Sequence, residues 1–445
     1  MSKRRVGELF SEVEPFPEML SPVTDPNLEV FQITTDLDAV GNSRGGFFTP
    51  DGSRFIFGRG REDRTEYTLC EVDDGFKLRV LTSEAGATRP VVTPDCKWAH
   101  YLVDETADRS PRVVLKRISL EDFRVETLTA YDKAVDGIGR VPRAGGRPVS
   151  GSKGFTSLRA DGMVACAGFN FYDEDKQQHH FAPVFINLET LAIHGFDWEP
   201  YSWRVGGQYY RGDDPRYLGH LMMNKNYRSQ HWDENGKLTE VYYNEQKQGA
   251  THVVDEQGNI LGTFPFAGDD QENSSHSEWR GGLYEVVTHS GAFHTAPHWR
   301  GTILTAPPID CPPEQRLLGR HIPGAKRVEL TRKITRPDVC HMSWHQSGKY
   351  AVCDTEGWHG RGTPCLQGPA AFLWLATVID DGKEDPYVAT RYLLHPRSSW
   401  HSALTENCQV LSPRLDTVFF NSDWTCKHGR PQVFCVRGFT FPESA

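Results

Sequence analysis

The stretch FFTPDGSRFIFG at residues 47–58 places an apolar pair before a Pro-Asp-Gly turn and an alternating apolar run after it. Turn residues between two runs of period two are typical of a β-hairpin. The same arrangement returns as VVTPDCKWAHYLV (91–103), SLRADGMVACAGF (157–169), SWHQSGKYAVCD (343–354) and VLSPRLDTVFFN (410–421). A frame that recurs roughly every 45 to 65 residues indicates a repetitive architecture.

A second hairpin follows the first in several repeats, as in EYTLCEVDDGFKLRVLT (66–82), PRVVLKRISLEDFRVETLT (111–129) and THVVDEQGNILGTF (251–264). Four strands per repeat make the blade of a β-propeller. We therefore predict an all-β fold, a single seven-bladed β-propeller with four-stranded antiparallel blades. The propeller is expected to span residues 41–440, with blades near 41–85, 86–149, 150–203, 204–270, 271–335, 336–399 and 400–440.

The two ends of the ring must meet, because closure removes the exposed edges of an all-β protein. Residues 1–40, which contain FQITTD at 31–36, are expected to supply a strand for this closure. The segment 198–217 shows no clean alternation and is predicted to be a long surface loop.

Composition narrows the class of protein. The 445 residues carry a formal charge of −10, which argues against nucleic acid or an anionic membrane as the partner. No signal-peptide core and no long apolar run is present, so a cytoplasmic monomer or small homo-oligomer is expected. The ten cysteines contain no C-x-x-C pair, which favours reduced thiols buried as small core residues over disulfides or a zinc knuckle.

A histidine recurs three residues before a tryptophan, in SHSEW (275–279) and in CHMSW (340–344). In the propeller frame these histidines, His276 and His341, begin the innermost strand of adjacent blades. The equivalent places are assigned to His220 in blade 4, Arg89 in blade 2, Arg44 beside it in blade 1, and Cys408 in blade 7 with His401 and Glu406 upstream. Four histidines are thus expected around one end of the central channel. The alternative is a hydrogen-bonded polar plug.

Such a cluster has the parts for removing an acidic proton beside a carboxylate. Imidazoles and a carboxylate suit a divalent metal, and a histidine is a general base near neutral pH. Arginine side chains bind a carboxylate through bidentate contacts, and the candidates are Arg44, Arg89, Arg204, Arg211 and Arg216.

These features resemble the seven-bladed propeller lyases of acidic sugars, above all the oligogalacturonate lyase family. The TPDG-type turns resemble that family over most of the chain, and CHMSW is similar to its segment whose histidine binds a divalent cation, commonly manganese. The resemblance implies that His341 is a metal ligand and that His276 takes the place of the catalytic base. The family's Gln and two His of the last blade do not recur in ALTENCQVLSP (403–413), where His401, Glu406 or Gln409 stand as substitutes.

The sequence therefore predicts a lyase that cleaves a uronate-containing oligosaccharide by β-elimination, with a divalent cation, Mn or Ca, as cofactor. The catalytic candidates are His276, His220, Arg216 and Tyr210. The candidates for binding the acidic oligosaccharide are Arg44, Arg89, Arg204 and Arg211. The metal-ligand candidates are His341, His401 and Glu406.

The sequence is also compatible with two other classes of protein. One is a propeller glycoside hydrolase or epimerase that uses the same residues. A hydrolase would need two opposed carboxylates, for which the loop residues Asp213, Asp214, Asp269, Asp270 and Glu272 are available. The other is a non-catalytic propeller that binds a partner protein on one face.

Overall fold

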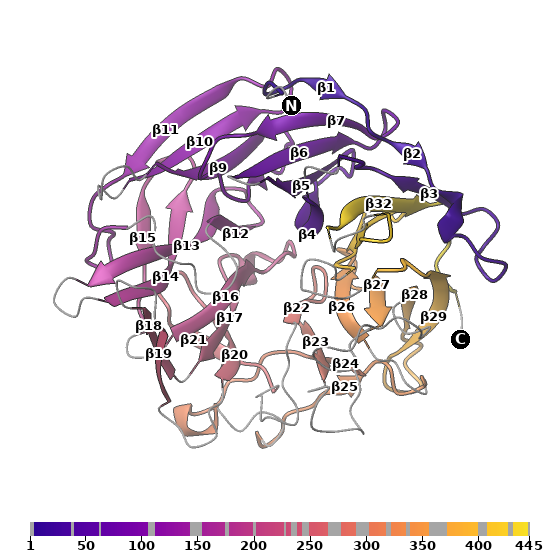
Figure 1. The fold of residues 1–445 in the computed structure, drawn as a ribbon. Coiled ribbons are helices and arrows are strands. Elements are labelled where there is room, and N and C mark those ends of the chain that lie inside the picture. The colour runs from indigo at the N-terminus through magenta and orange to yellow at the C-terminus, as the bar shows by residue number, and fades with distance from the viewer. Residues whose placement is uncertain are drawn as a thin grey trace.

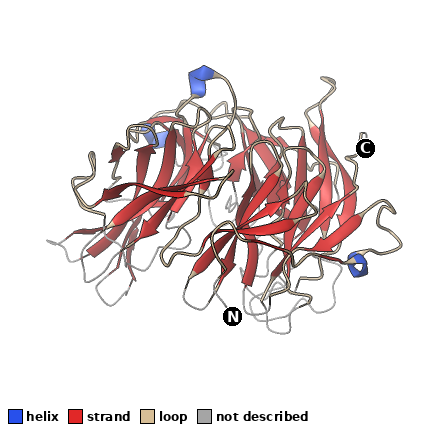
Figure 2. Ribbon diagram, turned by 90° about the horizontal axis from the view of Figure 1, so that it is seen from above, coloured by secondary structure: helices blue, strands red, loops and turns tan. Residues whose placement is uncertain are grey.

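Seven antiparallel sheets stand radially around a common axis, as the computed structural model shows (Figure 1). The residues described are 4–36, 40–61, 64–105, 112–142, 154–173, 178–198, 202–226, 228–232, 238–242, 249–265, 277–290, 302–316, 322–334, 339–355, 372–398, 407–425 and 430–443. The predicted all-β, seven-bladed propeller is confirmed. Viewed along its edge, the ring consists of strands joined by loops, with short 3-10 helices at its rims (Figure 2).

Each blade starts at the axis and ends at the outside of the ring. The innermost strands, from blade 1 to blade 7, are β4 (Val40–Phe48), β8 (Val91–Val92), β12 (Gly154–Leu158), β16 (Ser202–Tyr209), β22 (Ser277–Trp279), β26 (Val339–Trp344) and β30 (Val410–Leu411). The second strands are β5 (Arg54–Gly60), β9 (Trp98–Asp104), β13 (Val164–Asp173), β17 (Leu221–Asn226), β23 (Val286–Ser290), β27 (Tyr350–Thr355) and β31 (Thr417–Ser422).

The outer half of each blade has the same order. The third strands are β6 (Thr65–Glu71), β10 (Val113–Ser119), β14 (Gln178–Asn187), β20 (Gly249–Val254), β24 (Thr302–Ala306), β28 (Leu373–Ile379) and β32 (Gln432–Arg437). The fourth strands are β7 (Lys77–Thr82), β11 (Val125–Tyr131), β15 (Ile193–Gly195), β21 (Ile260–Thr263), β25 (Val328–Glu329), β29 (Tyr387–Leu394) and, from the N-terminal segment, β3 (Glu29–Gln32).

Strand β3 pairs with β32, so the two ends of the chain share blade 7. Several sheets are larger than four strands. The short strands β1 (Leu9–Phe10) and β2 (Glu14–Pro15) extend blades 1 and 7. A hairpin of β18 (Arg228–Trp232) and β19 (Leu238–Tyr242) leaves blade 4 and pairs with β14 of blade 3.

The expectation of a surface loop over 198–217 is wrong, because β16 is the innermost strand of blade 4. Its pairing with β17 shifts register between Arg204 and Gln208, where the sequence reads RVGGQ. An irregularity of this kind breaks the alternation of side chains that marks a strand in sequence. The glycine pair therefore makes this inner strand unrecognisable from the alternation of its sequence.

The hydrophobic core lies between the blades. Seven buried clusters fill the seven contacts between neighbouring sheets. At the closure of the ring, the rings of Phe55 in blade 1 and Phe419 in blade 7 stack with centroids 4.1 Å apart. Within the described residues, no helix has the length and apolar character needed to cross a membrane.

Candidate functional site

Hydrogen bonding at the turns fixes which residues of different blades are equivalent. In blade 6 the last pair before the turn is Trp344 with Ala351, and in blade 7 it is Leu411 with Val418. Counting three residues back from each inner member gives His341 and Cys408. The same count from Val92, which pairs with Ala99 in blade 2, gives Arg89. These three residues therefore lie at the same level, at the end of the ring where the inner strands begin.

His341 is held by a buried carboxylate on the neighbouring strand. Its Nδ1 lies 3.0 Å from Oδ2 of Asp354, and its backbone N–H donates to Oδ1 of Asp354 over 2.6 Å. The side chain of Asp354 is fully buried. Burial alone would lower the pKa of His341, but the Asp354 carboxylate, followed by the Cys408 and Cys340 thiols, raises this pKa well above its ordinary value.

The arrangement orients the ring as well as charging it. With Nδ1 engaged by Asp354, Nε2 is the ring atom directed elsewhere, and it lies 3.8 Å from Sγ of Cys340. Cys340, His341 and Asp354 offer donor atoms that all lie within 4.8 Å of one another. A histidine whose other nitrogen is held by a carboxylate is the usual form of a metal-ligating histidine. The residues present therefore fit a divalent cation, with His341 as ligand and Asp354 as its orienting partner.

A second charged group lies farther along the axis. Nη1 of Arg211 lies 3.9 Å from Oε2 of Glu278, which is the middle residue of β22. Burial raises the pKa of Glu278 to about 7, against the opposing effects of Arg211 and a hydrogen bond from the Trp344 backbone. Glu278 is therefore about half protonated at neutral pH.

Arg89 adds positive charge to this group. Burial, and after it the nearby charge of Arg211, lower the pKa of Arg89, and its Nη1 donates to the Thr156 carbonyl over 3.5 Å. Its guanidinium carbon lies 5.3 Å from the centre of the Phe47 ring. Arg89 and Arg211 thus bring two guanidinium groups near one another, and such groups bind an anionic ligand through charge-assisted hydrogen bonds.

The placement of His220 at the start of an inner strand is wrong. His220 follows the turn after β16, where its carbonyl accepts a hydrogen bond from the Tyr210 backbone. Its Nδ1 lies 2.7 Å from the hydroxyl of Tyr284, on the turn after β22. His220 is therefore at the end of the ring opposite to His341. The hidden strand β16 explains the error, because the run after His220 is the second strand of its blade.

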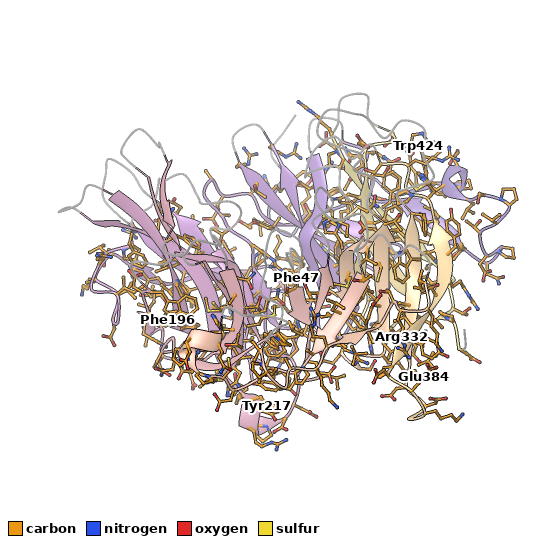
Figure 3. The ribbon with its side chains drawn as sticks, turned by 90° about the horizontal axis from the view of Figure 1, so that it is seen from below. Phe47, Phe196, Tyr217, Arg332, Glu384 and Trp424 are labelled. Atoms are coloured by element: carbon orange, nitrogen blue, oxygen red, sulfur yellow. The ribbon has the colours of Figure 1, made fainter. Side chains whose placement is uncertain are left out.

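Tyr210 and Arg216 belong to the same turn as His220. Tyr210 donates its hydroxyl proton to the Gly282 carbonyl over 2.8 Å, and Arg216 pairs with Asp214 beside it. Figure 3 shows Tyr217 of this turn on the rim opposite to Trp424, which follows β31. The structure therefore separates His220, Tyr210 and Arg216 from His341.

Two of the remaining candidates lie on inner strands, and three lie outside the described residues. Arg44 lies in β4 and Arg204 in β16. His276, His401 and Glu406 lie outside the described residues, His276 directly before the first residue of β22. Their assigned roles stay predictions.

Sequence reasoning missed Asp354, Cys340 and Glu278. The signal for Asp354 was a carboxylate at the end of the apolar run YAVCD (350–354), where an acid has to be paired to be buried. Glu278 lies within SHSEW itself, between the histidine and the tryptophan of that motif.

Comparison with known proteins gives a fold-level likeness. No family model matches the sequence, and no curated protein matches it. Among solved structures, an oligogalacturonate lyase in complex with manganese aligns over 99% of both chains with a TM-score of 0.60 and 15% identity. An oligogalacturonate lyase from Vibrio parahaemolyticus aligns over 97% of this chain and 98% of its own, with a TM-score of 0.56 and 14% identity. The chain thus has the fold of these structures at a low level of identity.

Proposed function

We propose that the protein is a lyase that cleaves a uronate-containing oligosaccharide by β-elimination. The observation that carries the proposal is the paired His341 and Asp354, which gives a chain with the fold of oligogalacturonate lyases an oriented imidazole at the predicted cation position. The reaction needs a neutralised carboxylate, a base for the C5 proton and a proton for the departing O4.

We assign the neutralisation of the uronate carboxylate to the end of the ring where the inner strands begin, which carries His341. A divalent cation, when bound, would withdraw charge from the carboxylate and make the C5 proton more acidic. His341 would hold this cation through Nε2, while Asp354 fixes the ring. Arg89, at the same level as His341, would bind a carboxylate of the substrate through charge-assisted hydrogen bonds.

Proton transfer is assigned to residues of blade 5. His276 is the proposed base, one blade before His341 in the frame. Glu278 is the proposed source of the proton for O4, because burial raises its pKa to about 7, so that it keeps a proton in part of the molecules at neutral pH, and it lies beside Arg211. Tyr210, which the sequence predicts as a catalytic residue, instead donates to the Gly282 carbonyl at the other end of the ring.

The test is to incubate the protein with oligomers of different uronates and to follow the near-ultraviolet absorbance of an unsaturated uronate product. We expect absorbance to rise on at least one acidic oligosaccharide and to stay flat with His276→Ala. His289→Ala changes another histidine of the same blade and is the matched control. A folded protein that cleaves no uronate, or His276→Ala with full activity, would overturn the proposal.

A further inference from the structure

An exposed arginine is stacked on a tryptophan at the same end of the ring as His341. The guanidinium carbon of Arg397 lies 4.0 Å from the centre of the Trp424 ring, and Trp424 is 36% exposed. Arg397 follows β29, the fourth strand of blade 6, and Trp424 follows β31, the second strand of blade 7. Second and fourth strands of an antiparallel blade end where its inner strand begins, so the stack lies on the rim that carries Trp424 in Figure 3.

Hydrogen bonds tie the two loops of the stack together. The hydroxyl of Ser422 donates to the Pro396 carbonyl over 2.7 Å. The hydroxyl of Ser398 donates to Oδ1 of Asp423 over 3.3 Å. The residues on either side of Arg397 are therefore attached to blade 7 directly before the tryptophan, and the arginine is held at a fixed place on this rim.

The backbone and the packing also position the two side chains. Arg397 has a φ of 56°, in the left-handed region that non-glycine residues rarely adopt, and strained residues of this kind concentrate at ligand-binding sites. Its backbone N–H donates to Nδ1 of His395 over 2.8 Å. The Trp424 ring packs edge-on against Phe16, with ring centres 5.4 Å apart, and Phe16 packs in the same way against Phe434 of β32. The tryptophan is thus anchored to the hydrophobic cluster between blades 6 and 7.

Other stacked arginines of this chain also bind one of its own carboxylates. The guanidinium carbon of Arg117 lies 4.0 Å from the centre of the Trp98 ring, and its Nη2 lies 2.7 Å from Oε2 of Glu126. The same combination of an aromatic ring and an acidic partner occurs at Arg79, Arg216, Arg280 and Arg437. Among the described residues, no acid pairs with Arg397. Its donors are therefore available for a carboxylate that a ligand supplies.

We propose that Arg397 and Trp424 form an outer subsite for a further uronate unit of the oligosaccharide, away from the bond that is cleaved. A guanidinium held flat on a ring presents its N–H groups as a fork that matches a carboxylate. His341 stands on the innermost strand of blade 6, whereas the contacts with Phe16 and Phe434 place the stack beside the third strand of blade 7. The inference rests on the proposed function, because it takes the occupant to be another unit of the same acidic chain.

The experiment measures binding of galacturonate, glucuronate and mannuronate oligomers of increasing length by isothermal titration calorimetry. It uses the His276→Ala background, so that no product forms. We expect Arg397→Gln to lower the affinity for a long oligomer by roughly 10-fold, since it removes charge-assisted hydrogen bonds, and to leave the affinity for the dimer unchanged. Arg117→Gln is the matched control, because this arginine has the same stack but its own acid, and it should leave both affinities unchanged.

Trp424 acts through the arginine, so its variants are measured in the same way. Trp424→Leu should lower the affinity for the long oligomer as Arg397→Gln does, and Trp424→Phe should retain it, because phenylalanine keeps a ring for stacking. The methyl ester of the same oligomer lacks the charged groups, and every variant should bind it equally. Near-ultraviolet circular dichroism checks that each variant is folded.

Three results would each overturn the inference. These are an affinity of Arg397→Gln that is unchanged at every length, an equal loss of affinity for the methyl ester, and a protein that binds none of the oligomers. Because the readout is binding, it is separate from cleavage. An affinity that depends on Arg397 in a protein that cleaves no uronate would refute the proposed lyase and leave the subsite standing.

Discussion

Asp354 holds His341 at two points, through Nδ1 of the ring at 3.0 Å and through the backbone N–H at 2.6 Å. The carboxylate therefore fixes both the position of the strand and the direction of the imidazole. We predict that Asp354→Asn lowers the affinity for a divalent cation by roughly 10- to 100-fold, because the loss of an orienting partner has this effect on metal-ligating histidines. Isothermal titration calorimetry with Zn²⁺ and Mn²⁺ measures the change.

Asp381→Asn is the matched control, because Asp381 lies on a turn of blade 6 and pairs with Lys383 at the surface. It should bind the cation as the unmodified protein does. An Asp354→Asn protein of unchanged affinity would show that the carboxylate only supports the strand.

Arg89 should contribute to the binding of acidic oligosaccharides and not to the binding of neutral ones. Replacing it by Gln removes charge-assisted hydrogen bonds, each of about 1.5–3 kcal/mol, so affinity for a uronate oligomer should fall by roughly 10-fold or more. Calorimetry on a His276→Ala background measures this without turnover of the substrate. Arg124→Gln, which changes an arginine on the rim of blade 2 that pairs with Glu126, should leave affinity unchanged. An equal loss of affinity for a neutral oligosaccharide would contradict the assignment.

Glu278 should make the stability of the fold depend on pH. Its folded pKa is about 7, against an ordinary value of 4.5. Between these values the folded state keeps a proton that the unfolded chain releases, so stability falls as pH rises through this window. Glu278→Gln carries no such proton and keeps an acceptor for the Trp344 N–H. Between pH 5 and pH 8 we expect the free energy of unfolding of Glu278→Gln to change by roughly 2 kcal/mol less than that of the unmodified protein.

Urea denaturation at several pH values measures this difference. Glu329→Gln serves as the comparison, because burial also raises the pKa of Glu329, which lies away from the axis on β25. Parallel pH profiles for the unmodified protein and Glu278→Gln would show that Glu278 titrates normally and would remove it as a proton donor.

The fold was predictable because turn chemistry repeats locally. In the first repeat, Asp51 accepts from the Thr49 hydroxyl and the Ser53 backbone, and Gly52 adopts a φ of 70°. These contacts lie within a few residues, so the sequence displays them. The same frame placed His341 and Cys408 at equivalent positions.

The features that the sequence did not predict depend on contacts between residues that are far apart in the chain. Asp354 is 13 residues from His341, and only the pairing of β26 with β27 brings them together. The contact of Arg211 with Glu278 joins different blades and has no trace in sequence spacing. In blade 4 the register shift at the glycine pair removes the alternation that identifies β16 as a strand. The sequence pattern therefore assigns the innermost position to the second strand, β17.

The N-terminal segment should stabilise the ring through a buried ion pair. Glu12 lies 3.1 Å from the guanidinium of Arg59, whose side chain is fully buried in blade 1. Removing one partner of a buried pair leaves a charge poorly compensated, although Asp36 also lies near Arg59. We expect Glu12→Gln to lower the free energy of unfolding by roughly 2 kcal/mol. Glu29→Gln breaks an exposed pair with Arg437 and should cost at most about 1 kcal/mol. Equal effects in urea denaturation would contradict this view of the segment.

His220 should be dispensable for catalysis. It lies at the end of the ring opposite to His341, with Nδ1 bonded to the Tyr284 hydroxyl. Its removal costs one hydrogen bond, so we expect His220→Ala to lose about 1 kcal/mol of stability. Its kcat/KM on a uronate oligomer, followed by product absorbance, should stay within about twofold of the unmodified protein, since no transition-state contact is lost. His276→Ala, measured beside it, should lose activity by a factor of at least about 100, the usual contribution of a general base. If His220→Ala loses as much activity as His276→Ala while remaining folded, the reaction takes place at the opposite end of the ring, and Tyr284 with His220 becomes its proton-transfer pair.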